Sequence, residues 1–298
     1  MSLGKNIKLF LAEIRIYQWT KNTLIFLPLI ISHEFSLDII SNNFVAFFAF
    51  SLIASGVYVF NDIKDVDKDK LHPSKKKRPL AAGDISFHTA LYLCALLLIS
   101  GILLSISISS LFLGIVLIYI LMNLLYTLHF KNYIIIDVIF LTSFYTIRLL
   151  CGHITSNVYP SIWLISFSIF FFFGLSLLKR YIDIKMVDGG KGSYKKYKSD
   201  DLYVISSLGI GSGLVSVLVF IMYTGSEKVQ QYFESPLLLL AMVPGFFYWI
   251  SRIWFFANRG KINIDPVMHT IKDRATYVLI LYFLIVFYLS SIELEFSF

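Results

Sequence analysis

The residues of this chain with the most evident chemical capacity lie between Asn61 and Gly83, in the stretch NDIKDVDKDKLHPSKKKRPLAAG. Successive residues of a helix turn by about 100°, so Asp62, Asp65 and Asp69 would fall within about 60° of one another on one face, whereas Asp67 would point nearly opposite. Three carboxylates that close repel one another unless a cation lies between them. The spacing therefore predicts a cation site on these three aspartates.

The cation that such a cluster favours is Mg²⁺, because it takes oxygen ligands and bridges carboxylates to phosphate oxygens. The basic run after the aspartates would supply charge for the remaining phosphate oxygens, with Lys75 as a point charge and Arg78 through a two-pronged contact. The alternative is a loop of solvated charges at a membrane surface, but scattered charges need no common helical face. The pattern predicts Mg²⁺ bound between the three aspartates and the phosphate groups of a substrate.

The composition places these polar residues in a membrane protein. The 298 residues are 57% apolar and 15% charged, whereas soluble domains carry about 25% charged residues. Apolar stretches of about twenty residues recur, which is the length that crosses a hydrocarbon core of about 30 Å. We expect the first to be retained, since no short apolar region with a small-residue cleavage site marks a removable signal peptide. The nine predicted spans are 20–38, 44–61, 86–107, 110–127, 133–152, 161–180, 202–223, 236–257 and 274–292.

The basic residues predict an orientation for these spans. With the N-terminus inside, 24 of the 26 lysines and arginines fall in internal segments, which is the bias of cytoplasmic loops. We therefore expect the N-terminus and the two long charged loops, 61–84 and 179–201, on the cytoplasmic side of the inner membrane. Because the positive charge lies between apolar spans, it indicates topology, and no nucleic-acid partner is expected. Arg148 is a charge within a span and needs a partner inside the helix bundle.

The second charged loop carries the run KRYIDIKMVDGGKG, which begins at Lys179. Lys179 and Asp183 are four residues apart and adjacent on a helix, whereas Asp183 and Asp188 are about 140° apart and do not form a same-face pair. The loop therefore offers two cations, Lys179 and Arg180, beside a single carboxylate. A basic anchor at the end of a helix is the alternative, since basic residues are common there.

Several stretches together resemble the UbiA-type intramembrane prenyltransferase superfamily. NDIKDVDKD is similar to its NDxxDxxxD motif, and HPSKKKRPLAAG resembles the HPxKxxRPxAxG continuation of the polyprenyl-phosphate phosphoribosyltransferase branch. Further matches to that branch are RIYQWTKN, the spacing from Lys131 to Asp137, YTIRLLCG, LLKRYIDI and RIWFFANRGKINIDPVMHTIKDR. The resemblance covers nearly the whole chain.

The resemblance implies a fold and a set of site residues. It implies an all-α, polytopic membrane protein: a single domain over residues 1–298, with nine helices around a lateral cavity that is open to lipid and capped by cytoplasmic loops. Mg²⁺ is expected on the three aspartates. The expected catalytic residues are Asp62, Asp65, Asp69, Lys179 and Asp183. The expected substrate-binding residues are Lys21, Asn22, Asn61, Lys75, Arg78, Lys131, Arg148, Arg180 and Tyr181.

The second loop departs from the family pattern, and this departure bears on the substrate. Typical members carry a second acidic motif, DxxxD, where this chain has Lys179, Arg180 and Asp183. A prenyl diphosphate held by two metal clusters suits two acidic motifs, whereas phosphoribosyl diphosphate has an additional phosphate that calls for cations. We therefore expect transfer of 5-phosphoribose from phosphoribosyl diphosphate to a polyprenyl phosphate, with Tyr181 and Asp183 available for the ribose hydroxyls or for a second metal site.

Two other functions remain as alternatives. One is a prenyl diphosphate-dependent prenyltransferase that acts on an aromatic or other acceptor, and the altered second motif argues against it. The other is a transporter. Transporters often bind near the middle of the bilayer on broken helices, whereas the charges of this chain gather at one predicted membrane face.

Overall fold

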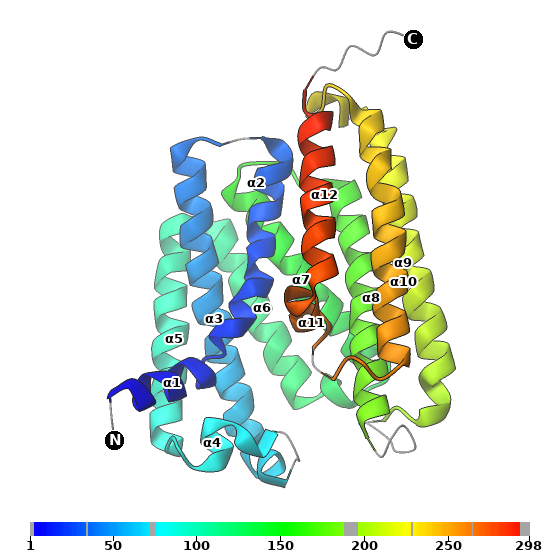
Figure 1. The fold of residues 1–298 in the computed structure, drawn as a ribbon. Helices are drawn as coiled ribbons and strands as arrows, with labels where there is room; N and C mark the ends of the chain where they lie inside the picture. Colours follow the sequence, from blue (N-terminus) through cyan, green and yellow to red (C-terminus); the bar gives the residue numbers. More distant parts are fainter. Residues whose placement is uncertain are drawn as a thin grey trace, which may run out of the picture. The chain divides into compact units, whose positions relative to one another are not determined.

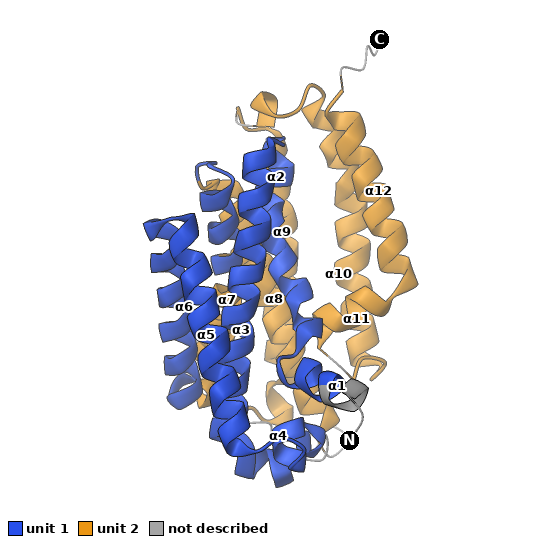
Figure 2. Cartoon of the chain, turned by 90° about the vertical axis from the view of Figure 1, so that its left-hand side faces the viewer, with its two compact units in different colours: residues 1–130, 147–159 blue, residues 131–146, 160–298 orange. Residues whose placement is uncertain are grey.

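We analysed a computed structural model of the chain, which describes residues 3–33, 35–71, 75–187, 196–227, 229–263 and 265–292. Within these ranges the regular elements are all helical (Figure 1), as the sequence predicts. The chain divides into two compact units, shown in different colours in Figure 2. The first contains residues 1–130 and 147–159, and the second contains residues 131–146 and 160–298. Asp188 lies outside the described residues.

The first unit is built on a long helix that carries the aspartates. Its elements are α1 (Leu3–Glu13), η1 (Ile16–Phe26), α2 (Leu27–Ser32), α3 (Leu37–Leu71), η2 (Lys75–Lys77), α4 (Pro79–Ala82), α5 (Phe87–Ile108), α6 (Ser110–Leu128) and the later part of α7 (Ile136–Thr155). Helix α3 packs mainly against α5. Serine N-caps begin both α5 and α6, since Ser86 and Ser109 accept backbone N–H bonds from the third residue of each helix.

The length of α3 explains why its last turns are charged. With 35 residues and a rise of about 1.5 Å per residue, it is about 50 Å long, longer than a hydrocarbon core of about 30 Å. The apolar part begins at Leu37, so the segment from Asp62 to Leu71 extends beyond the hydrocarbon. Lys68 and Lys70 lie in the last turn, where positive charge interacts favourably with the helix dipole.

The second unit pairs two long helices at a glycine contact. Its elements are the early part of α7, α8 (Ile162–Met186), η5 (Ser199–Asp201), α9 (Leu202–Thr224), η6 (Val229–Gln231), η7 (Pro236–Ala241), α10 (Met242–Asn258), α11 (Pro266–Lys272) and α12 (Arg274–Ser290). The short η3 (Phe130–Asn132) lies at the boundary of the two units. A Cβ at Gly174 of α8 would come within 2.8 Å of the Gly209 carbonyl oxygen of α9. Glycine is therefore required for this close approach.

The number of spanning helices differs from the prediction of nine. Among the described residues, seven helices are long and apolar enough to cross a membrane, and α11 with α12 makes an eighth if that pair, bent by 82°, is one span. The predicted first span, 20–38, contains most of the 3₁₀ helix η1 and the six-residue α2, which is followed by His33 with a positive φ of 57°. Trp19 and Asn22 of η1 donate hydrogen bonds to serines of α3, and Asn22 accepts one from Arg148 of α7.

Candidate functional site

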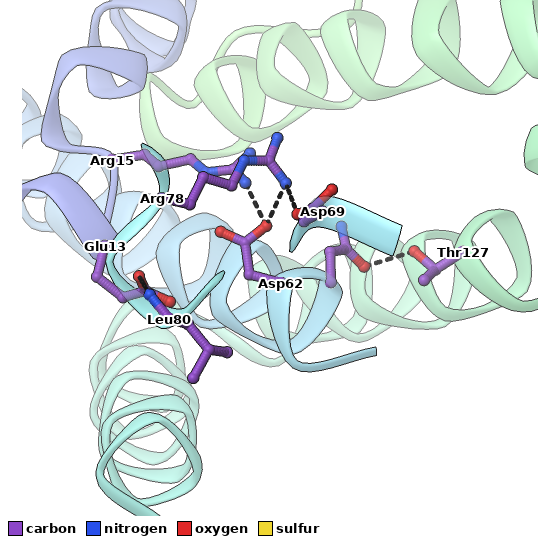
Figure 3. Close-up of polar contacts among 8 residues, drawn as sticks. Glu13, Arg15, Asp62, Asp69, Arg78, Leu80 and Thr127 are labelled. Atoms are coloured by element: carbon purple, nitrogen blue, oxygen red, sulfur yellow. Dashed lines mark hydrogen bonds and ion pairs between the residues drawn. The ribbon is translucent and has the colours of Figure 1, made fainter. Parts of the chain in front are cut away.

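Two of the three predicted aspartates converge on one arginine in the first unit. Asp62 and Asp69 of α3 are each 3% exposed. Arg78 Nη1 donates to Asp62 Oδ1 at 2.7 Å and also to Asp69 Oδ2, so that one guanidinium nitrogen lies between the two carboxylates (Figure 3). Arg78 follows η2 and precedes α4, and Pro79 at the first position of α4 fixes the backbone beside it. We call Asp62, Asp65, Asp69, Arg15 and Arg78 the aspartate site.

Arg15 is a member of the aspartate site that the sequence analysis did not identify. Its Nη2 donates to Asp62 Oδ1, and its guanidinium lies 5.1 Å from the centre of the Tyr58 ring. The residue has a left-handed backbone, with φ 53° and ψ 49°, at the turn between α1 and η1. Arg15 is the first residue of the quoted motif RIYQWTKN, so a signal was present, but only the folded chain shows that it reaches an aspartate 47 residues away.

The predicted common helical face is confirmed for Asp62 and Asp69, and the prediction that Asp67 points away from it is confirmed as well. Asp67 is exposed over 89% of its side chain and pairs with Lys70 at 3.2 Å, on the opposite side from Asp62 and Asp69. Asp65 is half-buried and takes part in interactions within the fold. Its metal-binding role stays a prediction.

The aspartate site does not contain a preformed three-carboxylate metal cluster. In the part of the chain that the structure describes, no three His, Cys, Asp or Glu side chains are grouped closely enough to hold a metal ion. Instead, the Arg78 guanidinium provides the positive charge between Asp62 and Asp69. Mg²⁺ commonly uses only one or two carboxylates, with water and substrate phosphate completing its ligands. The two converging carboxylates therefore fit Mg²⁺ once the arginine moves aside.

Asn61 is oriented by a neighbouring helix. Thr127 of α6 donates its hydroxyl to Asn61 Oδ1 at 2.5 Å, and Thr127 is buried at 4% exposure. With its oxygen occupied in this way, Asn61 keeps its amide N–H groups for another acceptor. Thr127 is a second residue that the sequence analysis did not identify, because its role depends on the packing of α6 beside α3.

Two of the predicted binding residues, Asn22 and Arg148, lie in a buried network of the first unit. Asn22 Nδ2 donates to Ser51 at 2.8 Å, and Asn22 Oδ1 accepts from Arg148 Nε at 2.7 Å. The prediction that Arg148 has a partner inside the bundle is thus confirmed. Its guanidinium also lies 5.0 and 5.6 Å from the ring centres of Phe50 and Tyr119, contacts that help to hold a buried cation. Lys21, at 9% exposure, is also buried.

Glu13, at the end of α1, connects the N-terminal helix to the loop of the aspartate site. The backbone N–H of Leu80 donates to Glu13 Oε2 at 3.3 Å, so the carboxylate caps the N-terminus of α4 (Figure 3). Glu13 is 1% exposed, and its Oε1 has no hydrogen-bond partner among the described residues. Burial, and after it the negative charge of Asp62, raise the pKa of Glu13 above its ordinary value.

The second unit contains a buried ion-pair network around Arg180. Arg180 Nε donates to Asp137 Oδ2 at 2.5 Å, and its Nη1 donates to Asp183 Oδ2 at 2.8 Å. Tyr197 also donates to Asp137, at 2.7 Å, and accepts the N–H of Ile135 at 2.8 Å. We call Arg180, Asp137, Asp183 and Tyr197 the arginine brace. Arg180 and Asp137 are 2% and 0% exposed, so this part of the brace is closed to solvent.

The remaining predicted residues of the second loop make contacts to the end of α10 and the loop beyond it. Lys179 Nζ donates to Asp265 Oδ2 at 3.2 Å, whereas the sequence suggested Asp183 as its neighbour; Asp183 instead pairs with Arg180. Tyr181 donates to Asn258 Oδ1 at 2.8 Å. Lys179 is about one-third exposed.

Two further predicted ligands, Lys75 in η2 and Lys131 in η3, are half-buried. Both take part in interactions within the fold. Their substrate-binding roles stay predictions, as do those of Lys21, Asn22, Arg180 and Tyr181.

The helical fold and the polar sites at the helix ends define the class of this protein: a helical membrane protein with charged sites at the ends of its apolar spans. Residues 23–191 match the UbiA prenyltransferase family. The chain therefore belongs to the UbiA prenyltransferase family and is an integral membrane protein and a transferase.

Three curated relatives illustrate the range of this family. The protein y4nM of Sinorhizobium fredii is 29% identical over 278 residues, 91% of this chain, and the chain spans about half of that relative's length (54%). The decaprenyl-phosphate phosphoribosyltransferase of Mycolicibacterium smegmatis is 27% identical over 282 residues, 90% of this chain and 87% of the relative. The digeranylgeranylglyceryl phosphate synthase of Methanocaldococcus jannaschii is 30% identical over 197 residues, 65% of this chain and 68% of the relative.

A solved structure supports the fold. The UbiA homologue of Archaeoglobus fulgidus, bound to GPP and Mg²⁺, superposes with a TM-score of 0.66 at 16% identity and covers 93% of this chain and 99% of its own. At that identity, the similarity shows a shared fold.

Proposed function

We propose that this chain transfers 5-phosphoribose from phosphoribosyl diphosphate to a polyprenyl phosphate, at the cytoplasmic face of the inner membrane. The observation that carries the proposal is the charge of the second region, where the last turns of α8 carry Lys179, Arg180 and Lys185 and a single aspartate, Asp183, which pairs with Arg180. One carboxylate that is already paired with an arginine is poorly suited to a second metal cluster. A donor with an additional phosphate group suits such a cationic region better than a prenyl diphosphate does.

Relatives support the same substrate class. The relative named decaprenyl-phosphate phosphoribosyltransferase aligns with 90% of this chain, so the similarity includes both charged regions. The solved homologue with GPP and Mg²⁺ supports a phosphate-bearing isoprenoid and a divalent metal as the kinds of ligand this fold accepts.

The transfer exchanges one bond for another at the anomeric carbon of the ribose. The bond from that carbon to the diphosphate breaks and the diphosphate leaves with the electron pair, while an oxygen of the lipid phosphate forms the new bond. The acceptor oxygen is already an anion, so no strong general base is needed. Asp62, Asp65 and Asp69 would hold Mg²⁺, whose positive charge would offset the charge that develops on the leaving diphosphate.

The residues of the aspartate site would bind and orient the donor. Arg78 and Arg15 have side chains 29% and 16% exposed, and both pair with Asp62. Each guanidinium can exchange a carboxylate for a phosphate oxygen, because both groups present the same two-oxygen edge. Asn61, oriented by Thr127, would donate its amide N–H to the same phosphate group.

The arginine brace would have a positioning role. Arg180 is surrounded by two carboxylates and almost completely buried, so its contribution is to hold Asp183 in place. Asp183, with a side chain 23% exposed, and the partly exposed Lys179 would then be the groups available to the ribose and its 5-phosphate.

The test supplies purified protein in lipid with polyprenyl phosphate and one of two labelled donors. Label from phosphoribosyl diphosphate should enter the lipid fraction, and chelation of divalent metal should abolish the transfer. Entry of label only from a prenyl diphosphate would replace this proposal with the prenyltransferase alternative. Absence of transfer from both donors, with pyrophosphate release also absent, would contradict both.

A further inference from the structure

Helix α1 has a side-chain distribution that none of the proposed chemistry uses. It lies crosswise to α3 in Figure 1, at the end of the unit where α4 is found, and packs against α4. With about 100° per residue, the side chains of residues 7–13 fall into three sectors. Each sector covers about a third of the helix and has its own chemistry.

The first sector faces the protein. Leu9 and Glu13 lie within about 40° of each other on the helix. Leu9 packs against the cluster that includes Leu80, Ile85 and Ala90, while Glu13 is buried and accepts the Leu80 N–H. Since Ala90 belongs to the first turn of the spanning helix α5, α1 lies at the depth where the spans end.

The second sector is apolar and exposed. Phe10, Ile7 and Leu11 follow one another within about 100°, and they are 41%, 51% and 39% exposed. The third sector contains Lys8 and Ala12, both exposed. One sector thus contacts the protein, one presents apolar groups and one presents a lysine. A helix that lies at the membrane surface needs these three sides, since it meets protein, lipid and water.

We infer that α1 is an interfacial helix, whose exposed apolar sector is inserted into the lipid surface of the membrane that the chain spans. The packing of Leu9 against the cluster that includes Ala90, in the first turn of α5, puts the apolar sector of α1 near the level at which that span begins. Lys8, beside that sector, is placed for the phosphate groups of the lipids.

This seat on the membrane also supports the aspartate site. Immediately after the lipid-facing residues, Glu13 holds the N-terminus of α4 and Arg15 holds Asp62. These two contacts, only two residues apart, form a strap that fixes the segment from Arg78 to Leu80. Lipid that keeps α1 in place therefore also keeps the two contacts of the strap in place, and Glu13 acts as a positioning residue for Arg78.

The test of the lipid seat does not depend on catalysis, so its outcome is separate from that of the proposed function. A nitroxide label is placed on the full chain in lipid nanodiscs, at Ile7→Cys, Phe10→Cys or Leu11→Cys, with Lys8→Cys and Ala12→Cys as matched controls. The natural Cys94 and Cys151 are buried, and the unaltered chain measures their background labelling. The three apolar positions should collide preferentially with oxygen, which dissolves in lipid, and the two controls with a water-soluble nickel chelate.

Two results would overturn the inference: equal nickel collision at all five positions, or exclusion of both reagents at positions 7, 10 and 11, which would mean that protein covers the sector.

The strap has its own measurement, amide hydrogen exchange over residues 78–82. Exchange should accelerate about fivefold in Glu13→Ala, which loses the acceptor of the Leu80 N–H, and stay near the native rate in Glu13→Gln, which keeps one. Unchanged exchange in Glu13→Ala would disprove the strap.

Discussion

Both charged regions of this transferase pair arginine with aspartate, but the more deeply buried partner is the aspartate in the first region and the arginine in the second. In the aspartate site the acids are buried, with Asp62 and Asp69 4% exposed at their side chains, and the bases that hold them are partly exposed. In the arginine brace the base is buried, at 2%, and the outer acid, Asp183, is 23% exposed. A partly exposed arginine can leave a buried carboxylate for a ligand, whereas a buried arginine between two acids is fixed. The first region is thus suited to exchange partners and the second to hold a position.

The largest expected effect is on stability, from removal of the buried base. Arg180→Met leaves Asp137 as a buried carboxylate without its cation and should lower the free energy of unfolding by about 3–5 kcal/mol. Denaturant or thermal unfolding in detergent measures the change. Arg78→Met is the matched control and should cost clearly less, because its partners can reach Arg15 or water. Equal losses in the two variants would remove the distinction between a fixed and an exchangeable pair.

The next effect is on activity, and it tests the aspartate face. Asp62→Asn removes a charge that pairs with both arginines and that is proposed to bind metal, and the transfer rate should fall on the order of 100-fold. Asp67→Asn changes the same residue type on the opposite side of α3, where the exposed side chain pairs with Lys70, and should keep near-native turnover. Loss of turnover in both variants would show that the helix-face assignment is wrong.

A smaller effect should follow from the loss of one hydrogen bond. Thr127→Val keeps the side-chain shape but cannot donate to Asn61, so the amide would turn and the KM for the donor should rise about fivefold, with kcat changed less. Thr127→Ser keeps the hydroxyl and should restore the native KM. If valine and serine behave alike, Thr127 does not orient Asn61.

The smallest effect concerns Glu13 and depends on pH. A raised pKa in the folded state means that the protonated carboxyl stabilises the fold below the ordinary glutamic acid value, about 4.3, and that this contribution disappears as pH rises through the raised value. Near neutral pH the ionised group therefore costs stability. Glu13→Gln should melt at the same or a higher temperature than the native chain near neutrality, and the native chain should gain on the variant as the pH falls. If Glu13→Gln were less stable than the native chain at neutral pH, the predicted destabilising effect of the ionised Glu13 would be wrong.

Sequence spacing predicted much of the aspartate site because the relation among its acids is local. Asp62, Asp67 and Asp69 lie on one helix, so a turn of 100° per residue is sufficient to separate the buried pair from the exposed residue. The same reasoning did not identify Arg15 or Thr127, which come from segments 47 and 66 residues away in sequence. It also suggested Asp183 beside Lys179, whereas the structure pairs Asp183 with Arg180 and Lys179 with Asp265.

The sequence by itself determined the membrane class, the helical secondary structure, the family and the charge of each loop, since these depend on composition and on periods of a few residues. Tertiary structure decided which opposite charges meet, which of them are buried, and that the segment at 16–32 is a 3₁₀ helix followed by a short α-helix. The physical reason is that an ion pair, a cap or a buried amide needs a partner at about 3 Å, and for residues far apart in sequence only the packing of helices sets that distance.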